Sequence, residues 1–125
     1  VCVGDNAKFS YLATKSENTP TDKVIKFVFN YYSIKHKKYK FTERGSDERQ
    51  YGSIGINLPL ASIMRSKYAT YKEYHTSKYN LEFVSEEGLS GSLDIYKKIV
   101  IVIENNLRYK SLVIEGEPFY TKYNL

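Results

Sequence analysis

The sequence predicts a mainly β protein, a single antiparallel β-sandwich domain over residues 1–125 with an immunoglobulin- or transthyretin-like shape. We expect about 7–9 short strands and one short helix near 59–73. Two observations carry the prediction. Apolar and polar residues alternate with a period of two in most segments, as in strands with one buried face. Turn-forming residues separate these segments at intervals of about 8–12 residues, which is typical of antiparallel sheets.

Several alternating segments precede the C-terminal third of the chain. They are rich in the aromatic and β-branched residues that suit a pleated sheet. The helix is expected after Pro59, because Leu60, Ile63 and Met64 follow at helical spacing and proline suits the first turn. An irregular loop or a continuing strand is the competing interpretation. The predicted strands in this part are 8–12, 25–32, 38–42, 54–58 and 78–83.

The C-terminal third is predicted to contain a β-hairpin. Residues 98–104 are apolar on both faces, which indicates a central strand covered on both sides. Asn105 and Asn106 follow, and asparagine tolerates the positive φ of a tight turn. The segment 86–92, rich in glycine and serine, is interpreted as a flexible turn before this strand. After the hairpin turn we expect a partner strand at 107–115, a turn at 116–118 and a last strand at 119–123.

The composition argues against most enzyme classes. The chain has two histidines, His36 and His75, four aspartates and a single cysteine, Cys2. A zinc site takes about four ligands, which this set does not supply, so we expect no metal and no cofactor. One cysteine allows no disulfide within the chain. We interpret both histidines as surface residues; a catalytic base at His75, paired with a nearby serine or tyrosine, is the remaining enzyme hypothesis.

The positive charge is concentrated in one segment. The net charge is +5, and no acidic residue lies between Asp22 and Glu43. Lysines and aromatic residues interleave across 23–41, the pattern of a sheet that binds an anionic polymer such as nucleic acid or acidic polysaccharide. A solvated basic hairpin turn at 35–40 is the competing interpretation, because lysines also protect exposed strand edges.

Tyrosine is abundant, with 13 copies and no tryptophan. A core of this size cannot satisfy so many hydroxyls, so several tyrosines should face water. Tyr68, Tyr71 and Tyr74 recur every third residue and would form one stripe on the expected helix. Exposed tyrosine is enriched at binding surfaces. We therefore predict a partner-binding surface formed by Lys35, Lys37, Lys38, Lys40, Tyr68, Tyr71, Tyr74 and Tyr79.

The functional prediction is a non-enzymatic, exported protein, periplasmic or secreted, that binds another protein. The chain begins at Val1 instead of methionine, which either removal of a signal peptide or the choice of the expressed segment explains. The longest aliphatic run, 99–103, is too short for a transmembrane helix of about 20 residues. The alternative function is binding of an anionic polymer through 23–41.

Overall fold

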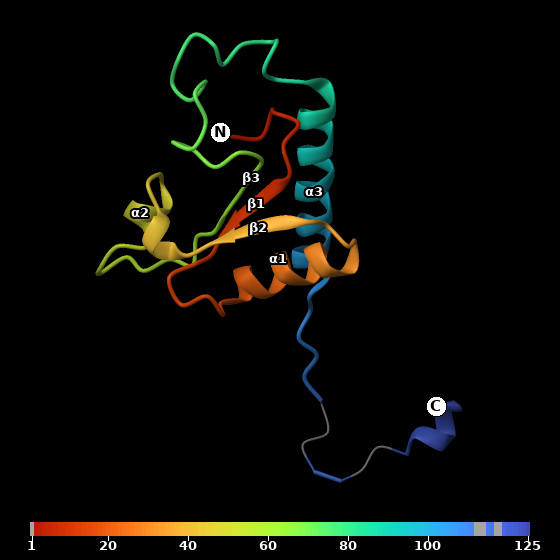
Figure 1. Ribbon diagram of the computed structural model, residues 1–125. Helices are drawn as coiled ribbons and strands as arrows, with labels where there is room; N and C mark the ends of the chain where they lie inside the picture. Colours follow the sequence, from red (N-terminus) through yellow and green to blue (C-terminus); the bar gives the residue numbers. More distant parts are fainter. Residues whose placement is uncertain (1, 112–114, 117–118) are drawn as a thin grey trace.

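A three-stranded mixed sheet forms the centre of the protein, with the strand order β2–β1–β3 (Figure 1). β1 (Phe9–Leu12) pairs in parallel with β2 (His36–Tyr39) and antiparallel with β3 (Ser62–Met64). The computed structural model describes residues 2–111, 115–116 and 119–125. Over these residues the fold is a small α/β domain, so the predicted antiparallel β-sandwich is wrong.

Two long helices pack on the sheet (Figure 1). α1 (Pro20–Tyr31) connects β1 to β2, and α3 (Glu86–Asn105) packs against α1. A parallel pair of strands needs such a crossover, which a helix usually provides. The remaining elements of the described residues are short: η1 (Phe41–Glu43), α2 (Glu48–Tyr51) and η2 (Tyr120–Tyr123).

Helix α1 occupies the place of the strand predicted at 25–32. Pro20 lies in its first turn, and the Asp22 carboxylate accepts the backbone N–H of Thr19 at 2.9 Å in a capping box. The alternation of aromatic residues in this segment is misleading, because the residues that reach the core follow helical spacing instead. These buried apolar residues are Val24, Ile25, Val28 and Phe29.

Helix α3 occupies the place of both the turn predicted at 86–92 and the strand predicted at 98–104. Ser85 is its N-cap, and the Ser85 hydroxyl accepts the N–H of Gly88 at 3.0 Å. The apolar run 99–103 winds around the helix, so its members point in different directions and only some reach the core. The buried residues of α3 are Gly88, Ser92, Ile95 and Ile99.

The remaining predicted elements in the middle of the chain also differ from the structure. The predicted helix at 59–73 is wrong, since β3 lies within this range and turns follow it. Turns and irregular backbone occupy 54–58 and 78–83, where strands are predicted. The strand predicted at 8–12 is confirmed as β1. The one at 38–42 is confirmed only in part, because β2 ends at Tyr39.

The predicted C-terminal hairpin is wrong as well. α3 continues to Asn105, and residues 107–111 contain no strand. A 3-10 helix, η2, stands where the last strand is predicted. Residues 112–114 and 117–118, which belong to the predicted strand 107–115 and turn 116–118, lie outside the described residues.

β1 is buried on both faces and separates two apolar clusters. Tyr11 belongs to the cluster formed with α1 and α3, whereas Leu12 belongs to a second cluster with Cys2, Met64 and Tyr68. Successive side chains of a strand point to opposite faces of the sheet, which explains this division. The second cluster adjoins the candidate site.

Among the described helices, none has the length and apolar character needed to cross a membrane.

Candidate functional site

A cavity of about 670 Å³ lies beside β3 and the second cluster. Distant parts of the chain form its walls: Cys2, residues 46–48 at the start of α2, residues 60–64 around β3, and several residues of 68–79. Tyr96 of α3 also contributes. The fold therefore brings residues as far apart along the chain as Cys2 and Tyr96 together in one cavity.

The four tyrosines of the predicted partner surface line this cavity. They form no helical stripe, because the segment that carries them consists of turns. Tyr68 is buried and the other three are half-buried. The ring centroid of Tyr71 lies 5.7 Å from that of Tyr74 and 6.1 Å from that of Tyr79. These rings therefore make up a cavity wall in which they contact one another.

Tyr71 and Tyr96 use their hydroxyls for hydrogen bonds within the protein. The Tyr71 hydroxyl donates to Sγ of Cys2 at 3.2 Å, and the Tyr96 hydroxyl donates to the carbonyl oxygen of Ile63 at 2.8 Å. Burial raises the pKa of both phenols above the usual value. Both residues therefore stay neutral at physiological pH and contribute apolar ring surface to the cavity.

Glu48 is a buried carboxylate in the cavity wall, with 1% of its surface exposed. Burial alone would raise the pKa of Glu48, but hydrogen bonds to the carboxylate outweigh burial and hold the pKa below its usual value. Glu48 is therefore ionised at neutral pH. Its four donors are the Tyr68 hydroxyl, the Gly45 N–H at 3.0 Å, the Ser46 N–H at 3.2 Å and the Ser62 hydroxyl at 3.2 Å.

Asp47 and His75 also line the cavity, and both are exposed. Asp47 is the N-cap of α2, yet its carboxylate accepts no capping hydrogen bond. The His75 ring stacks on Tyr74 with 4.0 Å between centroids. The backbone of His75 has a φ of 55°, in the left-handed region that few residues other than glycine adopt. Within the described ranges, neither side chain has a hydrogen-bond or ion-pair partner.

A carboxylate and an imidazole without partners are groups that transfer protons or bind metal ions. Across the described residues, no three or more side chains of His, Cys, Asp or Glu are arranged to hold a metal. The sequence indicates His75 only as the base of an enzyme hypothesis, and it does not indicate Asp47 or Glu48. No local spacing marks these two acids, because the cavity that they line is completed by residues far along the chain.

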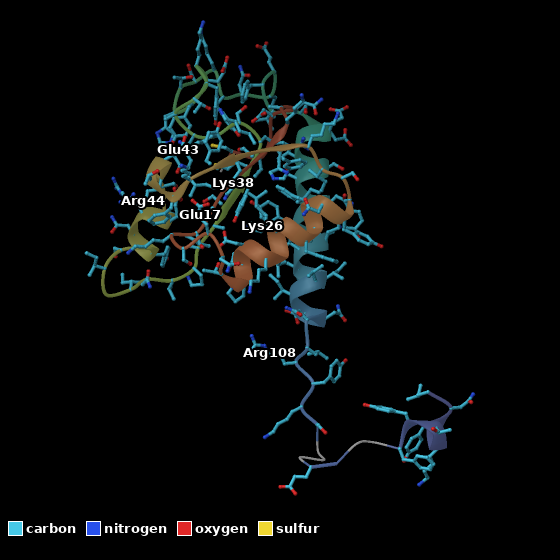
Figure 2. The ribbon with its side chains drawn as sticks, turned by 60° about the horizontal axis from the view of Figure 1, so that its bottom comes forward. Glu17, Lys26, Lys38, Glu43, Arg44 and Arg108 are labelled. Carbon is cyan, nitrogen blue, oxygen red and sulfur yellow. The ribbon has the colours of Figure 1, made fainter. Side chains whose placement is uncertain are left out.

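The four predicted lysines lie on β2 and on either side of it, and none of them lines the cavity. Lys37 and Lys38 lie within β2, an edge strand that pairs in parallel with β1, so the segment 35–40 is not the turn of a hairpin. Lys38 forms an ion pair with Glu17, whose carbonyl oxygen accepts a hydrogen bond from Lys26, and Figure 2 shows the three residues near one another. The lysines therefore form a surface separate from the tyrosine-lined cavity. They are Lys35, Lys37, Lys38 and Lys40, all exposed.

Residues 1–106 match the model of a family described as Domain of unknown function (DUF4910). A Clostridium acetobutylicum protein, named as a polysaccharide biosynthesis protein with an aminopeptidase-like domain, is 39% identical over 117 residues. This match covers 94% of the chain and 27% of that protein.

A crystal structure of a Clostridium acetobutylicum protein named as a peptidase is similar to this chain, with a TM-score of 0.80 and 38% identity. The similarity covers 96% of this chain and 28% of the other. The chain thus spans little more than a quarter of the length of either relative. Because the family model matches most of the sequence, the chain belongs to the family described as Domain of unknown function (DUF4910).

Proposed function

We propose that this chain forms one wall of the active site of a peptidase, with Asp47 and His75 as the groups that act on the substrate. The observation that carries the proposal is that both line one cavity and have no partner among the described residues. Ionisable groups in a cavity that make no hydrogen bond or ion pair to the protein are available to act on a ligand. The names of the two relatives, peptidase and aminopeptidase-like, support the same class of reaction.

The activity is proposed for the whole protein, because the chain corresponds to little more than a quarter of each relative. Further groups of the active site would then come from other parts of that protein. An active site shared between this chain and the rest of the protein is consistent with an open cavity that Asp47 and His75 line.

Peptide hydrolysis requires activation of a water molecule, stabilisation of the charge that develops on the carbonyl oxygen, and protonation of the leaving amine. An imidazole exchanges protons near neutral pH, and a carboxylate accepts a proton or orients the imidazole. The same two groups are ligands of catalytic zinc, which lowers the pKa of its bound water. Asp47 and His75 would supply part of such a ligand set.

Two sequence-based expectations compete with this proposal and stay predictions. One is a non-enzymatic, exported module that binds another protein, and the other is a binder of anionic polymers through 23–41. Neither gives a role to a free carboxylate and a free imidazole in a tyrosine-lined cavity. The peptidase proposal accounts for both groups.

The proposal is tested by measuring hydrolysis of a panel of aminoacyl p-nitroanilides by the intact protein that contains this chain. We expect Asp47→Asn and His75→Gln each to lower kcat/KM about 100-fold or more, as loss of an acid–base or metal-binding group does. Asp94→Asn and His36→Gln are the matched controls, because they make the same chemical changes outside the cavity. Both controls should keep kcat/KM within about two-fold.

Unchanged rates in both cavity variants would exclude the proposed site. Absence of hydrolysis by the unaltered protein over the whole panel would exclude the peptidase function. Dialysis against a chelator, followed by addition of Zn²⁺, separates the two chemical roles. Activity that is lost and then restored shows that the active site requires a metal, which Asp47 and His75 would help to hold, whereas activity that survives the chelator favours their role in acid–base catalysis.

A further inference from the structure

Glu48 is an ionised group in an unusual place. It is 1% exposed, lies in the cavity wall directly after Asp47, and has no cationic partner among the described residues. A buried charge is costly unless hydrogen bonds surround it, and the four donors to the Glu48 carboxylate meet that need. The carboxylate therefore holds the groups that donate to it in fixed positions.

Glu48 shapes the turn that carries Asp47. Its Oε1 accepts the N–H groups of Gly45 and Ser46, the two residues that precede Asp47, at 3.0 and 3.2 Å. The Tyr68 hydroxyl also accepts the Gly45 N–H, at 2.8 Å, so the side chains of Glu48 and Tyr68 hold the turn together. The carboxylate of Asp47 is not used for capping α2. Asp47 is left free on the cavity wall.

The same carboxylate is connected to His75 through aromatic contacts. The Tyr68 hydroxyl donates to Oε1 of Glu48. The Tyr68 ring lies 6.5 Å from the Tyr74 ring, which stacks on the His75 imidazole at 4.0 Å. A change at Glu48 would therefore disturb both the turn that carries Asp47 and the support of His75.

We infer that Glu48 is a positioning residue, which fixes Asp47 and His75 relative to each other through the Tyr68 hydroxyl and the turn at 45–48. The inference rests on the proposed function, because it assigns a role within the same site. Glu48 does not act on the substrate itself. Loss of orientation slows the chemical step more than it weakens substrate binding. Changes at Glu48 should therefore lower kcat more than they raise KM.

Glu48→Gln and Tyr68→Phe test the inference in the intact protein. Both keep the size of the side chain; the first removes the charge and the second removes only the hydroxyl. We expect each to lower kcat about 10- to 100-fold while KM changes less than about three-fold. Because both weaken the contact between the Tyr68 hydroxyl and the Glu48 carboxylate, their effects should be less than additive in the double variant.

Tyr11→Phe is the matched control. It removes a buried phenol hydroxyl that donates to another buried carboxylate, that of Asp22, and Tyr11 does not line the cavity. Its kcat should stay within about two-fold of the unaltered value. Thermal melting of all variants reports how far each change affects the fold alone. If Glu48→Gln fails to fold, Tyr68→Phe decides the question.

An unchanged kcat in Tyr68→Phe, or an equal loss in Tyr11→Phe, would overturn the inference, since Glu48 would then support only the fold. This failure is distinct from failure of the proposed function. If Asp47→Asn and His75→Gln are inactive while Tyr68→Phe is fully active, the site stands and the positioning role falls. If Asp47→Asn and His75→Gln keep their activity, the proposed site is excluded, and if the unaltered protein hydrolyses no substrate, the peptidase function is excluded.

Discussion

The carboxylate of Asp22 accepts a hydrogen bond of 3.0 Å from the backbone N–H of Thr14, and so joins the chain after β1 to the first turn of α1. The same carboxylate accepts hydrogen bonds from the Tyr11 hydroxyl and the Thr19 N–H. Asp22 is fully buried. One side chain thus fixes the connection on which the parallel pairing of β1 with β2 depends.

Replacing Asp22 by alanine should lower the free energy of unfolding by about 3–5 kcal/mol, because several buried donors lose their acceptor at once. Urea denaturation followed by circular dichroism measures the loss. Asp94→Ala is the control, since Asp94 pairs with Lys98 on the surface and such pairs contribute less than about 1 kcal/mol. Equal losses in the two variants would contradict the role of Asp22.

The protein should also lose stability in acid through Asp22. Burial alone would raise the pKa of this carboxyl, but hydrogen bonds from Thr14, Tyr11 and Thr19 outweigh burial and hold the pKa well below its usual range. A carboxyl whose pKa is lowered by folding stabilises the folded state above its unfolded pKa of about 3.9. That stabilisation is lost as the pH falls toward the folded value.

The free energy of unfolding, measured from neutral pH to about pH 3, checks this expectation. It should fall more steeply in the unaltered protein than in Asp22→Asn, whose side chain does not titrate. Parallel curves for the two proteins would show that Asp22 does not carry the acid sensitivity.

Gly88 lies where α3 meets the backbone of the N-terminal segment. A Cβ at this position would lie 2.2 Å from the carbonyl oxygen of Gly4 and 2.6 Å from that of Asp5. In an open helix, replacing glycine by alanine stabilises by about 1 kcal/mol. Here the added methyl group would meet rigid backbone, so we expect Gly88→Ala to destabilise by about 1–3 kcal/mol in urea denaturation.

Gly91→Ala is the comparison within the same helix. Its Cβ would meet Nη2 of Arg65 at 2.3 Å, the far end of a side chain that can shift. The shift costs the 3.3 Å hydrogen bond from Arg65 to the Gly88 carbonyl, a smaller loss than a backbone clash. A Gly88→Ala protein as stable as the unaltered one would rule out this close approach.

Helix α3 carries apolar residues on two sides, and only one side is buried in this structure. Ile95 is 4% exposed and belongs to the cluster with α1, whereas Leu93 is 55% exposed. Ile95→Ala should cost about 2–4 kcal/mol, because it leaves a cavity in the core. Leu93→Ala should stay within about 0.5 kcal/mol. If thermal unfolding shows similar losses of stability for Ile95→Ala and Leu93→Ala, another part of the protein covers the side chain of Leu93.

The sequence predicts β1 but neither long helix, and the reason lies in the residue types. The run 99–103 consists of β-branched residues, which favour strands by local preference. The signals for α3 are the Ser85 cap and the acidic first turn, which stand more than ten residues before that run. Contacts of Ile95 and Ile99 with the core then override the local preference.

Only part of the candidate site can be predicted from the sequence, because sequence patterns show groups of residues that are close along the chain and not contacts between distant ones. Tyr68, Tyr71 and Tyr74 are close along the chain, so their grouping is visible in the sequence, although the turns that carry them are not. The contact between Glu48 and Tyr68 spans 20 residues, and no local pattern encodes it. Asp47 gains its place on the cavity wall through that long-range contact.

The left-handed backbone of His75, with a φ of 55°, bears on how this position varies in evolution. Glycine and asparagine adopt this conformation readily, so a chain freed from selection for activity should drift toward one of them. On the proposed peptidase function, histidine should persist in relatives that hydrolyse peptides and give way to glycine or asparagine in relatives that do not. The residue at this single position would then separate the two kinds of relative.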